Sequence, residues 1–155
     1  LQSLMDETGA PLAAFKTIPF VDERLDHGDV LHVGSVPIDV LYTPGHTPHC
    51  VCFMVNGEKL LVGDTMYVGR ASKSDPSTRR QMRIYYDTLQ QLMELDDRIE
   101  VWPSHRVGHR QSSTIGRERK HNYVIRMSFE DFCARRWNDA AMRWIVPRKR
   151  RRRRK

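Results

Sequence analysis

The sequence predicts an α/β sandwich, and two observations lead to this fold class. Apolar runs and helical stripes follow one another in the order strand, strand, helix, strand, helix, a pattern that favours helices packed on a sheet. The chain has 155 residues, of which 39% are hydrophobic. A chain of this length and composition supports a globular core of single-domain size.

The first third of the chain predicts one helix and a hairpin. Residues 1–8 are typical of the end of a helix that stops at Gly9, with Pro11 beyond it. Apolar and polar residues alternate through residues 29–42 on both sides of Gly34-Ser35. This alternation predicts two strands joined by a tight turn.

The middle of the chain predicts a second hairpin and a long helix. Residues 50–55 and 59–62 are apolar runs on either side of Asn56-Gly57, a strong hairpin signal. The sequence Asp75-Pro76 then predicts a helix start, with Asp75 as N-cap and Pro76 at the first helical position. This helix is expected to end near Asp96-Asp97, and its apolar stripe comprises Met82, Tyr85, Leu89 and Leu92.

The last third predicts a strand followed by two helices. Residues 99–102 form a short apolar run, and residues 112–114 can cap a helix that begins near Ile115. Residues 129–144 are typical of a closing helix.

Three predicted strand ends each carry a side chain that can bind a metal ion. They are His46 within T-P-G-H-T-P (residues 43–48), Asp64 within G-D-T (residues 63–65) and His105 within W-P-S-H (residues 102–105). A stiff sheet can hold ligands that lie far apart in sequence. Each residue alone is also compatible with ordinary turn or cap chemistry. Their combination favours a metal site.

Other histidines and cysteines do not fit a metal site. His105 and His109 have helical i, i+4 spacing, but Pro103 and Gly108 disfavour a helix there. Cys50 and Cys52 would share one face of a strand, which favours apolar packing. The remaining histidines have no partner at ligand spacing and are expected to be structural or surface residues: His27, His32, His49 and His121.

Charge and cysteine usage limit the partners. The formal net charge is +7, and the last eight residues alone carry +8, so the rest of the chain carries −1. Contact with nucleic acid is therefore expected only through this tail. Three cysteines without C-x-x-C favour a reducing, cytoplasmic location. No apolar run approaches the roughly 18 residues of a membrane span, and no membrane partner is expected.

The three motifs resemble those of the metallo-β-lactamase superfamily. The stretch S-S-T-I-G-R-E-R (residues 112–119) is similar to the hydroxyacylglutathione hydrolase (glyoxalase II) branch, and persulfide dioxygenases carry a similar stretch. The family's H-x-H-x-D-H motif does not precede His46. We therefore expect residues 1–146 to be the C-terminal portion of an αββα sandwich without its N-terminal metal-binding segment. Residues 147–155 are expected to be a disordered basic tail.

In the hydrolase branch, the resemblance implies that His46 binds one metal ion and His105 a second, with Asp64 bridging the two as the catalytic residue. Zinc is the expected metal, with two ions, and iron is the alternative. A metal-bound hydroxide would attack a small-molecule thioester or ester, such as one linked to glutathione. We expect this chain by itself to be inactive.

Two alternatives remain open. In the persulfide dioxygenase branch, the resemblance implies a single iron held by His46, Asp64 and one upstream histidine. The chain could also be a non-catalytic remnant that serves as a binding module.

Overall fold

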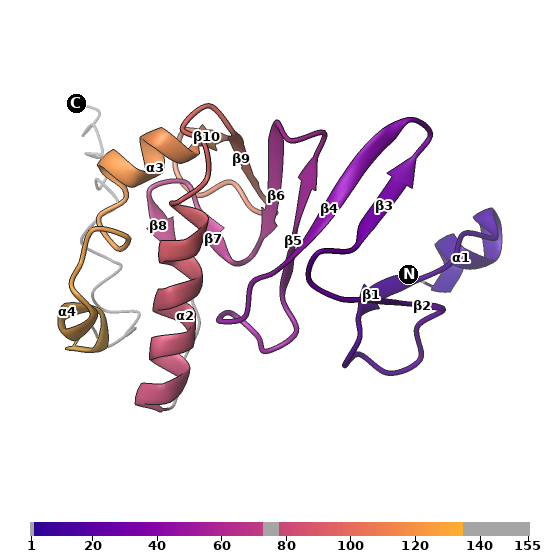
Figure 1. Ribbon diagram of the computed structural model, residues 1–155, viewed down its shortest axis with the longest axis horizontal. Coiled ribbons are helices and arrows are strands. Elements are labelled where there is room, and N and C mark those ends of the chain that lie inside the picture. Colours follow the sequence, from indigo (N-terminus) through magenta and orange to yellow (C-terminus); the bar gives the residue numbers. More distant parts are fainter. Residues whose placement is uncertain (1, 73–77, 135–155) are drawn as a thin grey trace, which may run out of the picture.

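A computed structural model describes residues 2–72 and 78–134 and places a six-stranded sheet at the centre of the molecule (Figure 1). The sheet has the order β10-β9-β6-β5-β4-β3. Its strands are β3 (Val30–Val33), β4 (Val36–Tyr42), β5 (Val51–Val55), β6 (Lys59–Gly63), β9 (Glu100–Pro103) and β10 (Ser113–Thr114). With its helices, this sheet confirms the predicted α/β class.

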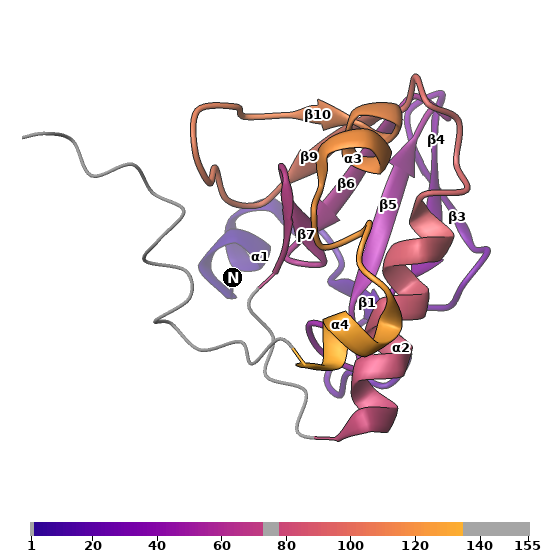
Figure 2. The ribbon, with the colours of Figure 1, turned by 90° about the vertical axis from the view of Figure 1, so that its left-hand side faces the viewer.

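Helices and two small strand pairs surround this sheet. The four helices of the described residues are α1 (Gln2–Thr8), α2 (Arg79–Leu92), α3 (Ile115–His121) and α4 (Phe129–Ala134). Figure 2 shows α2 running alongside β5, with α4 packed next to it. The small pairs are parallel β1 (Ala13–Phe15) with β2 (Glu23–Leu25), and antiparallel β7 (Met66–Tyr67) with β8 (Arg70–Ala71).

The two predicted hairpins are present. Strands β3 and β4 pair across Gly34-Ser35, and β5 and β6 pair across the turn at Asn56-Gly57. Asn56 has φ 52° and Gly57 has φ 66°. A type I′ turn requires positive φ at both central residues. The backbone twist of such a turn matches the twist of the two strands that it joins.

The connection from β6 to β9 is a crossover through α2. These two strands are parallel, with Leu60 opposite Val101 and Gly63 opposite Pro103. Parallel neighbours cannot be joined by a tight turn and need a longer connection, usually a helix. Helix α2 supplies that connection and packs on the sheet that it joins (Figure 1).

The main core lies between α2 and the sheet. Tyr85 and Leu89 of α2 are completely buried, as are Cys52, Leu60 and Val101 of the strands. The same cluster includes Phe132 of α4, whose ring meets that of Tyr85 edge to face at 5.9 Å between centroids. The stripe predicted for α2 is therefore the face that covers the sheet.

A smaller apolar contact forms on the opposite face of the sheet. Phe15 of β1, Leu25 of β2 and Val40 of β4 are buried there. The ring of Phe15 stacks on that of Tyr42 at 4.3 Å between centroids. The β1–β2 pair therefore covers part of this face.

The start of α2 differs from its prediction. The helix begins at Arg79 rather than Pro76, so the prediction of Asp75 as its N-cap is wrong. Thr78 is the N-cap: its hydroxyl accepts from the Gln81 N–H, and the Gln81 side chain accepts from the Thr78 N–H. This capping box satisfies two donors at the helix start. The helix ends at Leu92, before the predicted Asp96-Asp97.

The end of the chain is only partly described. Helix α4 begins at the predicted residue, while residues 135–144 of the predicted closing helix and the tail at residues 147–155 lie outside the described residues. Among the described helices, none combines the length and the apolar character needed to cross a membrane.

We predict that Leu89→Ala destabilises the fold by about 2–5 kcal/mol, because it opens a cavity in a fully buried site. The matched control is Ile84→Ala on the same helix, where the side chain is 39% exposed and the expected change is within about 0.5 kcal/mol. Urea unfolding followed by circular dichroism measures both. Equal effects of the two substitutions would contradict this placement of α2.

Candidate metal centre

Three strands deliver the candidate ligands to one edge of the sheet. Strands β4 and β6 both run antiparallel to β5, and β9 runs parallel to β6. The carboxyl ends of β4, β6 and β9 therefore point the same way. His46 follows β4, Asp64 follows β6 and His105 follows β9. The three candidate ligands therefore lie at the same end of the sheet, although β5 separates β4 from β6.

His46 lies in a tight loop between β4 and β5. The Thr43 N–H donates to the Cys50 carbonyl at 2.9 Å and closes this loop. The Nδ1 atom of His46 lies 3.0 Å from the Ser72 hydroxyl. Its other nitrogen, Nε2, lies 3.8 Å from Oδ2 of Asp64. One ring nitrogen is thus held by the protein while the other faces the carboxylate.

The carboxylate of Asp64 has a different environment at each oxygen. Its Oδ1 accepts hydrogen bonds from the hydroxyls of Tyr67, at 3.0 Å, and Ser104. Burial raises the pKa of Asp64, but these two hydrogen bonds and the nearby imidazoles of His105 and His46 outweigh it, so the pKa lies below the usual range. Asp64 is therefore an anion at neutral pH.

His105 approaches the same carboxylate from β9. Its Nε2 lies 3.6 Å from Oδ1 of Asp64. The side chain of His105 is 68% exposed, against 27% for His46. His105 is thus close to Asp64 but less enclosed than His46. The other histidines of the described residues are exposed, including the four that were expected to be structural or surface residues: His27, His32, His49, His109 and His121.

The donor set fits a metal ion between pairs of these residues. Imidazole nitrogen and carboxylate oxygen bind zinc or iron at about 2.0–2.2 Å, so two donors to one ion lie roughly 3–4 Å apart. Both the His46–Asp64 and the His105–Asp64 separations have this size. The contact from Ser72 to the far side of the His46 ring is typical of metal-binding histidines.

A complete metal site is not formed by this part of the chain. Within residues 2–72 and 78–134, no group of three or more His, Cys, Asp or Glu side chains could hold a metal ion. The two pairs share Asp64, and each supplies two protein ligands. A metal ion bound at either pair would need further ligands.

Buried hydroxyls connect the loops that carry His46 and Asp64. The Thr43 hydroxyl lies 3.4 Å from that of Thr65 and 3.2 Å from the thiol of Cys52. All three residues are buried, and burial raises the pKa of Cys52 to about 11. Cys52 is therefore a neutral packing residue, as the sequence predicted.

Two supporting residues were missed by sequence analysis. Ser72 follows β8 and reaches His46 across 26 residues of chain, and Tyr67 lies in β7 beside Asp64. Neither stands in a recognisable ligand motif. The only available signal was their closeness in sequence to G-D-T, within a loop whose course the sequence does not specify.

The S-S-T-I-G-R-E-R stretch supports the site from a distance. Thr114 caps α3, as predicted, by accepting from the Arg117 N–H. The buried carboxylate of Glu118 accepts from the Gly69 N–H at 2.9 Å and so fixes the β7–β8 turn that follows Tyr67. Arg119 donates to the Met93 and Leu95 carbonyls after α2.

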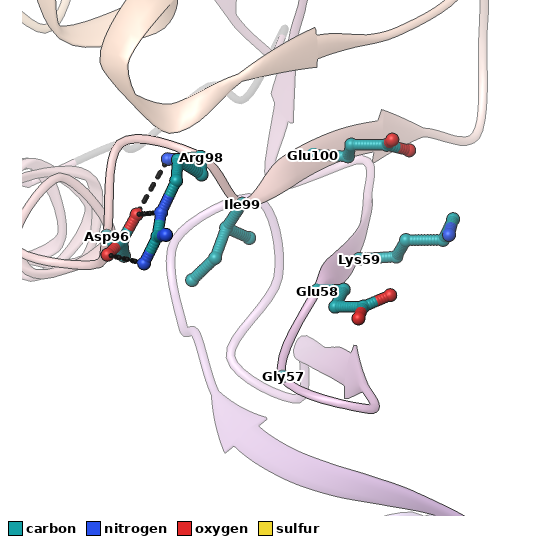
Figure 3. A pocket seen from close by; sticks show the side chains of 7 residues that line it. All are labelled: Gly57, Glu58, Lys59, Asp96, Arg98, Ile99 and Glu100. Atoms are coloured by element: carbon teal, nitrogen blue, oxygen red, sulfur yellow. Dashed lines mark hydrogen bonds and ion pairs between the residues drawn. The ribbon is translucent and has the colours of Figure 1, made fainter.

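A separate cavity of about 500 Å³ lies at the other end of β6 and β9 (Figure 3). Its lining mixes both signs of charge, and the Arg98 guanidinium points at Asp96, with which it forms an ion pair. None of His46, Asp64 and His105 lines it. This cavity is therefore not part of the candidate metal centre.

Solved structures identify the fold. ETHE1 from Myxococcus xanthus superposes with a TM-score of 0.77 and 26% identity, covering 95% of this chain and 64% of that chain. A metallo-β-lactamase from Staphylococcus aureus gives a TM-score of 0.73 and 24% identity over 84% of this chain and 45% of that one. A protein solved in a di-iron-bound form gives a TM-score of 0.59 and 20% identity, covering 78% of this chain and 68% of that chain. The chain has the metallo-β-lactamase fold, as predicted.

Curated relatives match a smaller share of the chain. An uncharacterized protein from Mycobacterium leprae is 38% identical over 97 residues, which are 61% of this chain and 43% of that protein. Persulfide dioxygenase ETHE1 of Mus musculus is 25% identical over 112 residues, which are 72% of this chain and 44% of that protein. The chain thus spans less than half the length of these relatives. No family model matches the sequence.

We predict that Ser104→Ala raises the pKa of Asp64, because the carboxylate loses a hydrogen bond that favours its charged form. Because the pKa of Asp64 is lower in the folded than in the unfolded state, its ionisation stabilises the fold at pH values above the unfolded-state pKa. This stabilisation is lost as the pH falls through the folded-state pKa. In the variant, that loss should begin at a higher pH. Carbon-13 NMR titration of the carboxyl measures the shift, with Ser35→Ala in the distant β3–β4 turn as control. An unchanged Asp64 pKa would contradict the proposed role of this hydrogen bond.

Proposed function

We propose that this chain supplies His46 and Asp64 as two iron ligands of a persulfide dioxygenase. In this assignment the His46–Asp64 pair holds one metal ion, and His105 is not a ligand. The third protein ligand implied by the resemblance, a histidine, does not come from the described residues.

The hydrogen bonding of Asp64 carries this proposal. Its Oδ1 already accepts from Tyr67 and Ser104, which use the two lone pairs of that oxygen. Its Oδ2 faces His46, whose ring is the less exposed of the two histidines. A carboxylate with one oxygen engaged by hydroxyls is suited to bind a single metal ion through the other.

The named relatives also support the dioxygenase over the predicted hydrolase. The curated name of the mouse relative is persulfide dioxygenase ETHE1, and a bacterial ETHE1 has the same fold over nearly the whole chain. No relative reported above carries the name of a glutathione thioester hydrolase. The expectation of a thioester substrate and of zinc therefore gives way to a persulfide and iron as the favoured proposal.

The chemistry assigned to the site is the oxidation of a persulfide sulfur by oxygen. One persulfide, one O₂ and one water give one thiol, one sulfite and two protons. Iron bound there would supply the redox chemistry with oxygen. His46 and Asp64 would hold the metal, Ser72 would fix the imidazole, and Tyr67 and Ser104 would keep the carboxylate ionised and oriented.

A second candidate function rests on His105. Its Nε2 lies 3.6 Å from Asp64, a separation that also fits two ligands of one ion. If Oδ1 exchanges its hydroxyl donors for a second metal, Asp64 bridges two ions, as in the predicted dinuclear glyoxalase II-like hydrolase. The number of metal ions therefore separates the two candidates.

We predict that the purified chain binds Fe²⁺ under anaerobic conditions and that His46→Ala and Asp64→Ala each weaken binding at least about 10-fold, because a ligand is lost. The control is His109→Ala, which removes an exposed histidine outside both ligand pairs. Isothermal titration and metal analysis are the readouts, since the chain alone is expected to be inactive. If no specific binding is detected, the metal assignment fails and the non-catalytic alternative is favoured.

We predict one iron per chain and an affinity within about twofold of wild type for His105→Ala, because His105 is not a ligand in the dioxygenase assignment. The same titration and metal analysis measure both quantities. Two ions per chain, together with loss of one of them in His105→Ala, would contradict the mononuclear site and support the hydrolase.

A further inference from the structure

Ser72 holds the ring of His46 from a rigid position. Its hydroxyl lies 3.0 Å from Nδ1 of His46, and the residue is completely buried. The backbone N–H of Ser72 donates to the Tyr85 hydroxyl at 2.9 Å. The partner of the imidazole is therefore itself fixed by a residue of α2.

The Tyr85 hydroxyl joins two segments of the site. While accepting from Ser72, it donates to the Thr65 carbonyl at 2.7 Å. Thr65 follows Asp64 directly in the chain. The Tyr85 hydroxyl therefore links Thr65, next to Asp64, with Ser72, the hydrogen-bond partner of His46. Burial raises the pKa of Tyr85, so the hydroxyl keeps its proton and remains a donor.

The Tyr85 ring also contacts the loop that carries His46. A Cβ added to Gly45 would lie 2.1 Å from Cδ2 of Tyr85, so only glycine fits against the ring. One turn further along α2, the Thr88 hydroxyl donates to the Pro44 carbonyl at 2.6 Å. Helix α2 thus contacts the backbone at two consecutive residues, Pro44 and Gly45, directly before His46.

We propose that Ser72 and Tyr85 are positioning residues of the proposed metal site, an inference that rests on the proposed function. Ser72 accepts a hydrogen bond from Nδ1–H of His46 and presents Nε2 to the metal. Tyr85 keeps Ser72, Thr65 and Gly45 in one arrangement. Neither residue touches the metal or the substrate in this assignment.

The chemistry of imidazole explains why such residues matter. A neutral imidazole has one protonated nitrogen, and the hydrogen bond made by that nitrogen decides which of the two can bind a metal. An acceptor at Nδ1 selects the form whose Nε2 carries the lone pair. Removal of such an outer partner typically weakens metal binding by about 10–100-fold.

The first test compares metal affinity in two pairs of variants. Ser72→Ala is expected to weaken Fe²⁺ binding by about 10–100-fold, while Ser72→Thr, which keeps the hydroxyl, is expected to retain most of the affinity. Tyr85→Phe is expected to weaken it by about 10-fold. Tyr86→Phe on the same helix is the matched control, because the Tyr86 hydroxyl donates to the Met127 carbonyl, away from the site. Equal affinities for the Tyr85 and Tyr86 variants would overturn the role of Tyr85.

The second test needs no metal and separates this inference from the proposed function. Nitrogen-15 NMR of His46, at a pH where the ring is neutral, reports which nitrogen carries the proton. We expect Nδ1–H in the wild type and loss of this preference in Ser72→Ala. Unchanged ring shifts in that variant would overturn the inference. If the shifts change but no iron binds to the wild type, positioning of the ring stands and the dioxygenase assignment fails.

Discussion

The parallel pairing of β6 with β9 is the constraint on which the candidate site depends. It brings Asp64 and His105 to one edge of the sheet, because the strands that precede them end there together. It also requires a crossover connection, and α2 fills that role. The helix that closes the core is thereby placed beneath the loops of the site, where Tyr85 and Thr88 reach them. The β6–β9 pairing thus determines both the packing of α2 on the sheet and the positions of Asp64 and His105.

The site is stabilised mainly by neutral groups rather than by ion pairs. Thr43, Thr65, Ser72 and Tyr85 are buried, and their hydroxyls make hydrogen bonds within the protein. A buried hydroxyl costs little when it is hydrogen-bonded, whereas an unpaired buried charge would cost far more. The Asp64 carboxylate is consequently the main fixed charge among these groups, and it would attract a cation bound beside it.

Sequence analysis could predict the strands, the turns and the three candidate ligands because each has a local signal. The Asn56-Gly57 turn and the motifs around His46 and Asp64 are examples. The start of α2 was misplaced because Asp75-Pro76 is a valid helix start, and only the structure shows that Thr78 and Gln81 form the cap. Likewise, Tyr85 fitted an apolar stripe, whose spacing predicts burial but not the partner of its hydroxyl. Roles that depend on tertiary contacts leave no periodic pattern.

The two candidate functions differ in how they use the Asp64 oxygen that Ser104 contacts. Ser104 lies directly between Pro103 and His105. A glycine offers no hydroxyl, whereas Ser104 donates to the Asp64 oxygen nearest His105. A second metal at that oxygen would have to compete with this bond and with the bond from Tyr67. The serine therefore supports a mononuclear site, and its replacement by glycine should make the carboxylate more available to a second ion.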